Sequence, residues 1–259
     1  MSYQTIKLDL SKDGVAILTL NQPQTGNLLD SQMRAEITDA AREAGRVARV
    51  LVLTGAGPTF CSGQNLSDRA NLDNLDLERV LRDEYGPMLR AIYDCPVPTL
   101  AAVNGAAAGA GANLALAADV VIAKHSASFQ QPLSRVGLIP DAGGTYWMTR
   151  NMGHAKAMGA ALFGDEISAE QADQWGLIWA AVPDEEFTPH CKERALQLAK
   201  GPTLAYRRMK EAIRDSWNND LQIQLEKEAR HQGSCARSRD FKEGVVAFVE
   251  GRPPHFEGR

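Results

Sequence analysis

The chain has few cysteines, no pairing pattern among them and no long apolar run. Its four cysteines are far apart, without a CxxC pair or a histidine cluster beside them. This spacing argues against a disulfide framework and against a metal site. No apolar stretch approaches the length that crosses a bilayer, and the N-terminus lacks the composition of a signal or transit peptide. We therefore expect a cytoplasmic protein that binds no metal and has no membrane segment.

A dominant charge is also missing. The 259 residues carry 28 basic and 32 acidic side chains, a net charge of −4, and no arginine-rich run. Nucleic acid is therefore not an expected partner. A hydrophobic content of 44% at this length suits one full core, as a single large domain or as a domain with an appendage.

Short apolar runs alternate with helical patterns over residues 1–200. Strands are predicted at 6–10, 15–20, 50–54, 99–103, 120–123, 128–130 and towards Val182. Helices are predicted at 31–48 and 110–116, and Ser168 with Gln171 forms a capping-box signature. This alternation predicts an α/β body.

Residues 201–259 form a separate helical region in the prediction. Apolar side chains recur at helical spacing over 204–216, 221–231 and 240–249. Terminal helices of this kind either dock on a neighbouring subunit or cover their own domain, and periodicity alone does not separate the two.

The segment 105–111 contains glycine and alanine alone and leads into the helix predicted at 110–116. Small residues let a ligand approach the backbone, and N–H groups at a helix start stabilise an anionic oxygen. Close packing without chemistry is the alternative. A dinucleotide site is disfavoured, because Leu114 stands where the third glycine of that motif belongs.

Several segments together resemble the crotonase (enoyl-CoA hydratase/isomerase) superfamily over nearly the whole chain. They are 21–27, 51–55, 60–66, 102–119, 137–145 and 168–176. Within the superfamily, 107–116, 137–141 and 157–162 are similar to the ring-1,2-epoxyphenylacetyl-CoA isomerases of bacterial phenylacetate catabolism. The resemblance implies a crotonase-like spiral of ββα turns, a helical C-terminal part that oligomerises, and a homotrimer or a homohexamer built as a dimer of trimers.

The resemblance also implies an acyl-CoA substrate, so that coenzyme A belongs to the substrate and no separate cofactor is expected. The two backbone N–H groups that hold the thioester oxygen in this family map onto Gln64 and Ala110. Such fixed donors stabilise the enolate that forms when a proton beside the thioester is removed.

The two glutamates of the family's hydratases match Asn113 and Leu133 here. Neither side chain is a base at neutral pH, which disfavours hydration by the two-carboxylate route. Asn113 could still orient a water molecule or a polar group of the substrate.

Asp141 is the carboxylate that the resemblance assigns as acid/base. By itself, an aspartate between Pro140 and Ala142 would be interpreted as a helix N-cap. One carboxylate can move a proton between two carbons on one face of an enolate, which is the chemistry of an isomerase. Burial near Leu133, Val136, Leu138 and Trp147 would raise its pKa towards neutrality.

CoA contacts are expected from two loops and from the C-terminus. The family positions correspond to Gln22, Asn27, Cys61, Ser62 and Leu66, and Arg252 is a candidate for the phosphates. Gln22 stands where relatives often carry a basic residue. The stretch 69–93 is expected to form one pocket wall.

The predicted reaction is isomerisation of ring-1,2-epoxyphenylacetyl-CoA to its oxepin form. The alternatives are a general 3,2-enoyl-CoA isomerase, an enoyl-CoA hydratase, and a dehalogenase, for which His125 is a weak base candidate because it is expected at the surface. A noncatalytic acyl-CoA-binding protein is the alternative from another class.

Overall fold

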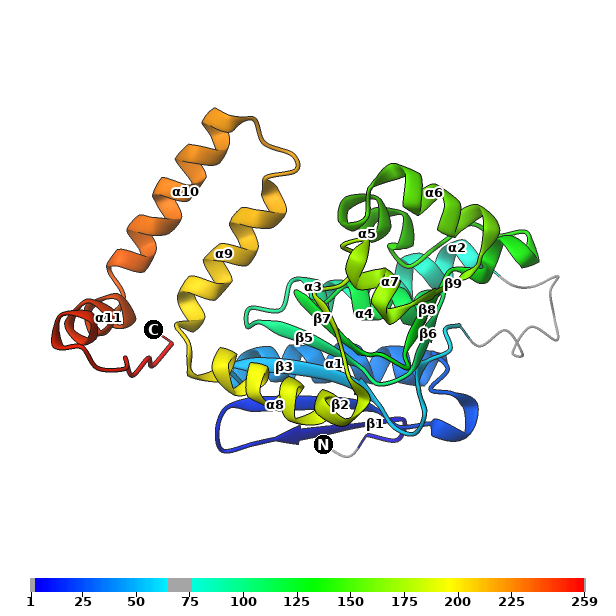
Figure 1. Cartoon of the computed structure of the whole chain (residues 1–259), viewed down its shortest axis with the longest axis horizontal. Coiled ribbons are helices and arrows are strands. Elements are labelled where there is room, and N and C mark those ends of the chain that lie inside the picture. Colours follow the sequence, from blue (N-terminus) through cyan, green and yellow to red (C-terminus); the bar gives the residue numbers. More distant parts are fainter. Residues whose placement is uncertain (1–2, 65–75, 259) are drawn as a thin grey trace.

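The computed structural model describes residues 3–64 and 76–258, and it contains two sheets (Figure 1). The larger sheet has the order β1(Ile6–Leu10), β2(Val15–Leu20), β3(Val50–Gly55), β5(Thr99–Val103), β7(Val120–Lys124), β10(Ala180–Val182). β1 pairs with β2 antiparallel, and all other neighbours in this sheet are parallel. The strands predicted at 6–10, 15–20 and 99–103 are confirmed at both ends.

The smaller sheet takes the strands that the larger one skips. Its order is β4(Thr59–Cys61), β6(Ala106–Ala108), β8(Ser128–Gln130), β9(Glu166–Ser168), with β9 antiparallel to β8. From β3 to β8 the chain therefore gives alternate strands to the two sheets. This is the repeated strand–strand–helix spiral that the sequence predicted.

Helices cover both faces of the larger sheet. Alternate strand residues face opposite sides, so Val50 and Leu100 pack with Phe187 and Cys191 of α8(Asp184–Lys200). The other face packs against α1(Ser31–Val47) and α4(Ala110–Leu116). Burial on both faces explains why these strands are almost continuously apolar.

Five further helices belong to the described core. They are α2(Leu77–Val80), α3(Gly86–Tyr93), α5(Gly144–Asn151), α6(Gly153–Phe163) and α7(Ala169–Gln174). Of these, α3 packs on α1, and α7 packs on β8 and β9 of the smaller sheet. The capping box is confirmed, since Ser168 Oγ accepts from the Gln171 amide and Gln171 Oε1 accepts from the Ser168 amide, both at 3.2 Å. A π-helical turn at Leu81–Tyr85 and short 3₁₀ turns at Pro23–Thr25 and Pro132–Val136 were not predicted.

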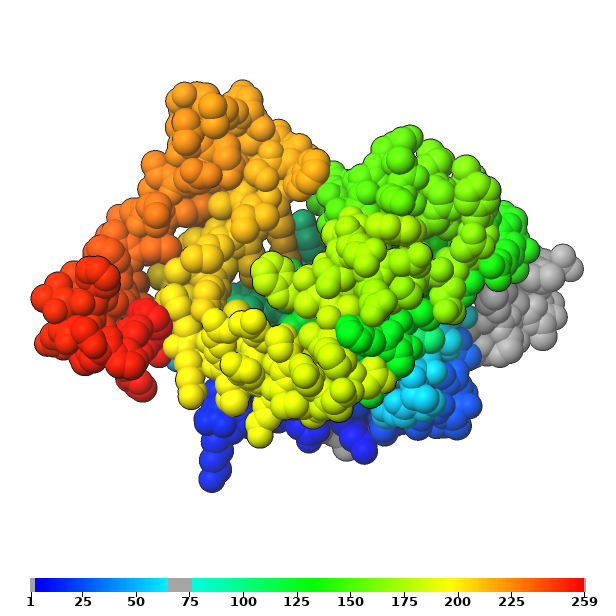
Figure 2. All heavy atoms as spheres, viewed as in Figure 1, coloured from blue at the N-terminus to red at the C-terminus, as the bar shows by residue number. Residues whose placement is uncertain are grey.

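The C-terminal helices α9(Thr203–Asp215), α10(Leu221–Ala236) and α11(Arg239–Glu250) form an arm beside the core (Figure 1). Figure 2 shows a hollow between this arm and the region of α5 and α6. A cleft of about 420 Å³ lies between α5 and α9 and is lined by Tyr146, Trp147 and Trp217. In the ranges 3–64 and 76–258, no helix is long and apolar enough to span a membrane.

Candidate active site

Asp141 begins a tight turn whose backbone is strained. The Gly144 amide donates to the Asp141 carbonyl at 2.8 Å. Between them, Ala142 has φ 47° and Gly143 has φ 83°, as in a type I′ turn. A non-glycine residue in this left-handed region costs about 1–2 kcal/mol, so the surrounding structure must hold the turn.

The interpretation of Asp141 as a helix N-cap is wrong. Helix α5 begins at Gly144, its N-cap is Gly143, and over residues 76–258 no side chain caps it. Asp141 therefore contributes its backbone carbonyl to the helix start, where it accepts from the Gly144 amide.

Two buried side-chain amides lie beside the Asp141 turn, Asn113 on α4 and Gln131 after β8. Asn113 Nδ2 donates to the Asp141 carbonyl at 2.8 Å, and Gln131 Nε2 donates to Asn113 Oδ1 at 2.8 Å. Asn113 is 0% exposed and Gln131 is 3% exposed. The structure therefore brings Asn113 and Asp141 together, and it adds Gln131, which the sequence analysis missed.

The surroundings of Asp141 are partly those expected. Its Oδ1 atom is buried, and Leu133 is buried nearby in the chain. Val136 is 55% exposed, so the prediction that it helps to bury Asp141 is wrong in this chain. The cause is the 3₁₀ turn Pro132–Val136, which ends in a left-handed Gly137 and turns Val136 outward.

Tyr85 is a polar neighbour of this site. It is 1% exposed and ends the π-helical turn. Burial raises the pKa of Tyr85, and the charge of Asp141 raises it further while Arg34 opposes both. π-helical turns are frequent at functional sites because they redirect side chains.

Arg34 holds the Tyr85 hydroxyl in the core. It donates to that hydroxyl at 3.4 Å, lies 4.6 Å from the ring centroid, and pairs with Glu84. Arg34 was missed by the sequence analysis, although an arginine on the apolar face of a predicted helix, beside Met33 and Ile37, is a signal that could have found it.

The two segments expected to supply the oxyanion hole lie side by side. A Cβ built on Gly63 would lie 2.6 Å from the Ala108 carbonyl oxygen and 3.7 Å from the Ala110 nitrogen. Gly63 also has φ +96°, so glycine alone fits there. Ala110 is the first residue of α4, where an amide has no acceptor inside the helix. Gln64, which follows Gly63, forms a bridge with Leu29.

Cys61 is a structural residue beneath this pair of segments. Its thiol donates to the Asn27 carbonyl at 3.1 Å, and burial raises its pKa to about 12. The thiol therefore stays protonated and is no nucleophile. A Cβ on Gly111 would lie 2.3 Å from the Cys61 carbonyl oxygen, which explains why a glycine stands there.

Four of the residues expected to contact CoA, Gln22, Asn27, Cys61 and Ser62, lie on segments that meet in the structure. Asn27 is 0% exposed, and its Nδ2 donates to the carbonyls of Thr59 at 2.8 Å and Phe60 at 3.1 Å, while its Oδ1 accepts from the Gln22 amide at 2.9 Å. Asn27 thus binds the loop of Gln22 to the strand of Cys61.

Exposed Ser62 donates to the Gly26 carbonyl at 2.9 Å, so these segments do meet beside Gln64.

Two predicted CoA contacts are not placed with the others. Leu66 lies outside the described residues. Arg252 follows α11, at the far side of the arm in Figure 1, and it donates to Glu243 at 2.7 Å and to Glu250 at 2.6 Å.

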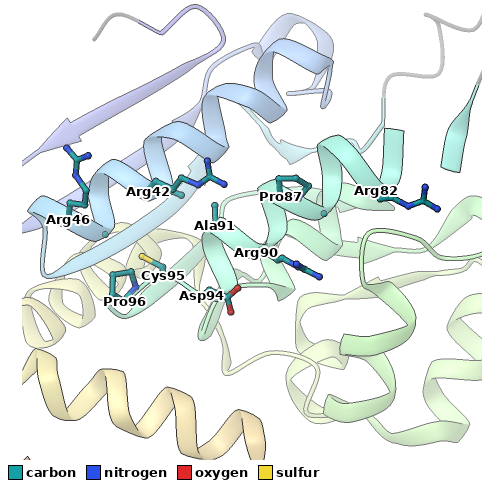
Figure 3. Close-up of a pocket in the computed structure, with 12 residues that line it drawn as sticks. Arg42, Arg46, Arg82, Pro87, Arg90, Ala91, Asp94, Cys95 and Pro96 are labelled. Atoms are coloured by element: carbon teal, nitrogen blue, oxygen red, sulfur yellow. The ribbon is translucent and has the colours of Figure 1, made fainter. Parts of the chain in front are cut away.

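A groove of about 820 Å³ lies between α1 and α3 and is bordered by Arg42, Arg46, Arg82 and Arg90 (Figure 3). Of the described site residues, none lines this groove. Among residues 3–64 and 76–258, no three histidine, cysteine, aspartate or glutamate residues cluster as metal ligands would.

Comparisons with known proteins identify the family. The enoyl-CoA hydratase/isomerase family model matches residues 11–259. The chain is 56% identical over 259 residues, all of both chains, to a probable enoyl-CoA hydratase of Rhodobacter capsulatus. It is 44% identical over 252 residues to the 1,2-epoxyphenylacetyl-CoA isomerase of Escherichia coli, with 95% of this chain and 96% of that protein covered.

A solved structure gives the same result. A putative enoyl-CoA hydratase/isomerase from Mycobacterium abscessus has a TM-score of 0.93 at 34% identity, over 98% of this chain and 100% of that one. The predicted crotonase-like α/β fold is thereby confirmed. The chain therefore belongs to the enoyl-CoA hydratase/isomerase family of the crotonase superfamily, and it is an enzyme that acts on CoA thioesters.

Proposed function

We propose that this enzyme is an acyl-CoA isomerase with one acid/base, Asp141. The observation that carries the proposal is the combination of residues around α4 and the Asp141 turn. Asp141 keeps a carboxyl group there, whereas Asn113 and Leu133 stand where the family's hydratases carry two glutamates. One carboxylate suffices to move a proton, but adding water by the usual route needs two.

The chemistry conserves every atom of the substrate. Asp141 removes a proton from the carbon beside the thioester, and the amides of Gln64 and Ala110 hold the oxygen of the resulting enolate. The protonated Asp141 then returns the proton to a carbon further along the acyl chain. The electron pairs shift along the chain, so that the double bond ends in conjugation with the thioester.

For the substrate, we propose ring-1,2-epoxyphenylacetyl-CoA, which would be converted to its oxepin isomer. Support comes from the 44% identical relative whose name states this activity. A general 3,2-enoyl-CoA isomerase uses the same proton transfer. A dehalogenase is disfavoured, because the His125 side chain is 42% exposed and lies 4.0 Å from Glu170, at the surface as expected.

Enoyl-CoA hydration is the second candidate, because the 56% identical relative is named a probable hydratase. In that case a water molecule would have to be activated without glutamates at 113 and 133. The isomerase proposal and the hydratase candidate therefore differ in a product that can be measured directly.

We also propose that the enzyme is a cytoplasmic homotrimer or homohexamer. The described arm exposes large apolar side chains, among them Trp217, Leu221 and Phe248, at 61%, 74% and 87%. Exposed apolar surface on this scale favours a protein partner, and a second copy of the same arm would supply a matching surface.

The test compares the wild type with Asp141→Asn on a 3-enoyl-CoA, a 2-enoyl-CoA and the epoxide. We expect isomerisation by the wild type and a loss of about 10³-fold in kcat for Asp141→Asn, since general acid–base groups contribute 10²–10⁴-fold. Asp165→Asn, at an exposed aspartate, is the matched control.

Three results would contradict the proposal. Hydration of the 2-enoyl-CoA without isomerisation would establish the hydratase. Binding of CoA esters without turnover would indicate a noncatalytic protein. Loss of folding in Asp141→Asn would assign Asp141 a structural role.

A further inference from the structure

We infer that Asn113 and Gln131 are positioning residues that hold the Asp141 turn in register with the oxyanion hole. The inference rests on the proposed role of Asp141 as acid/base. It gives Asn113 a task different from the substrate-orienting one that the sequence suggested, and it assigns a function to Gln131.

The amide of Asn113 is fully occupied by the protein. Its Nδ2 donates to the Asp141 carbonyl at 2.8 Å and approaches Gln131 Oε1 at 3.5 Å, while its Oδ1 accepts from Gln131 Nε2 at 2.8 Å. An amide NH₂ has two hydrogens, and both have protein acceptors here. With 0% of the residue exposed, Asn113 has no donor left for a substrate.

Asn113 supports a strained turn. The Asp141 carbonyl accepts from the Gly144 amide and from Asn113, both at 2.8 Å. The turn between Asp141 and Gly144 contains Ala142 in the left-handed region, which is strained for a residue with a Cβ. The bond from Asn113 therefore holds a conformation that the local sequence does not favour.

Close packing of Gly144 against the Asn113 amide adds to the hydrogen bond between Asn113 and the Asp141 carbonyl. A Cβ built on Gly144 would lie 2.7 Å from Asn113 Nδ2 and 3.1 Å from Asn113 Oδ1. Gly144 thus lets the turn lie directly on the Asn113 amide. Any larger residue at 144 would push the turn away from α4.

Helix α4 links the two halves of the site. Asn113 lies in the first turn of α4, three residues after Ala110, and its own amide donates to the Gly109 carbonyl at 3.1 Å. The helix that presents the Ala110 amide therefore also carries the side chain that locates Asp141. A fixed distance between these groups matters, because a displacement of about 1 Å can cost 10²-fold in rate.

Gln131 keeps the Asn113 amide in the correct orientation. If Gln131 did not donate to Asn113 Oδ1, the amide could rotate by half a turn and present oxygen to the Asp141 carbonyl. Gln131 follows β8 and is 3% exposed, so it acts on Asp141 through Asn113.

The experiment follows deuterium exchange at the carbon beside the thioester of phenylacetyl-CoA in D₂O, together with isomerase kinetics. We expect Asn113→Ala to lower the exchange rate and kcat by about 100-fold, with KM within a factor of about three. Gln131→Ala should lower both by about tenfold, and the double variant should resemble Asn113→Ala, because the two residues act as one unit.

Gln131→Glu is a second variant that keeps the size of the side chain. Its two acceptor oxygens should draw the Asn113 NH₂ away from Asp141, so we expect a fall in kcat. Because a carboxylate at this buried position also costs stability, kcat is measured at a temperature at which the variant is folded. The control is Gln130→Ala at the last residue of β8, directly before Gln131, which removes an amide that donates to the Gly164 carbonyl at 2.9 Å. This control should keep wild-type kcat.

The outcomes separate the two proposals. No exchange by the wild type would overturn Asp141 as acid/base. Exchange by the wild type with unchanged rates in both Gln131 variants, or additive losses in the double variant, would overturn the positioning role. A rise in KM alone for Asn113→Ala would show that Asn113 contacts the substrate.

Discussion

The spiral core and the C-terminal arm differ in how much each one buries within a single chain. Helix α1 buries seven of its 17 residues, from Met33 to Ala44. In the described arm, α9 with 13 residues and α10 with 16 bury none, and α11 buries Asp240 and Ala247. Helix α1 thus packs its apolar face within the chain, whereas the arm carries apolar surface that its own chain does not cover.

The two regions are joined by charges. Lys210 and Arg214 of α9 each donate to Asp119 at 2.7 Å, and Lys210 also donates to the Cys95 and Val97 carbonyls at 2.7 and 2.8 Å. Arg214 further lies 3.6 Å from the Tyr93 ring centroid. Specific polar contacts orient the arm, and its apolar side chains stay exposed in the single chain.

The largest effect is expected from breaking this junction. Asp119→Ala leaves two cations with 10% and 19% side-chain exposure without their carboxylate. Such a loss costs about 3–5 kcal/mol of unfolding free energy, measured by urea denaturation. The matched control is Glu43→Ala, which breaks the Glu43–Arg46 pair at the groove of Figure 3, where the Arg46 side chain is 76% exposed. Glu43→Ala should cost about 1 kcal/mol or less of unfolding free energy. Equal losses in the two variants would contradict the claim that the Asp119 pairs join the arm to the core.

The next effect concerns the apolar face of the arm. We expect Leu221→Asp with Phe248→Asp to weaken self-association by about a hundredfold or more, because each buried apolar anchor is worth about 2 kcal/mol. Light scattering across a dilution series measures the mass. Lys242→Asp on α11 is the control and should keep the assembly. An unchanged mass in the double variant would show that the arm does not mediate assembly.

The smallest effect is expected for the pH dependence of stability, which can be compared between Glu36 in the core and Glu243 in the arm. Burial opposes ionisation of Glu36, yet hydrogen bonds from Thr5 and from the Gln4 amide lower its pKa to about 2. A hydrogen bond from Arg252, then one from the His255 amide, lowers the pKa of Glu243 to about 2 as well. In both cases the folded form has the lower pKa, so the stabilisation is complete above pH 4.5 and is lost as the pH falls towards 2.

Salt should separate the two glutamates. Neutral donors hold Glu36, so we expect the melting temperature difference between wild type and Glu36→Gln to persist in 1 M NaCl. The corresponding difference for exposed Glu243→Gln should shrink, because the Arg252 charge is screened. The measurement is the melting temperature from pH 2 to 6 at two salt concentrations, and equal salt sensitivity would contradict the distinction.

Much of the core could be predicted because its signals are local. The glycine–alanine segment, the capping box and the strands at 6–10 and 99–103 all depend on residues close in sequence. Helix α10 extends five residues beyond its predicted end at 231, because it continues through Gly233, a residue type that more often ends a helix than lies inside one.

The candidate site was less predictable where it depends on distant contacts. The proline before Asp141 and the glycines after it suit a helix cap, but the strained turn at Ala142 is held by Asn113, 28 residues earlier. Gln131 and Arg34 act through partners 18 and 51 residues away. The helical spacing marks Arg34 as unusual on an apolar face, but it does not indicate a partner so far along the chain.

The pairing of Asp119 with Arg214 has a consequence for synthesis of the chain. The two residues are 95 positions apart, with the carboxylate made first. At about 5–20 residues per second, a ribosome needs roughly 5–20 seconds to add the missing cation. During that interval the nascent core carries an acidic group without its final counter-charges, which only the later synthesis of α9 provides.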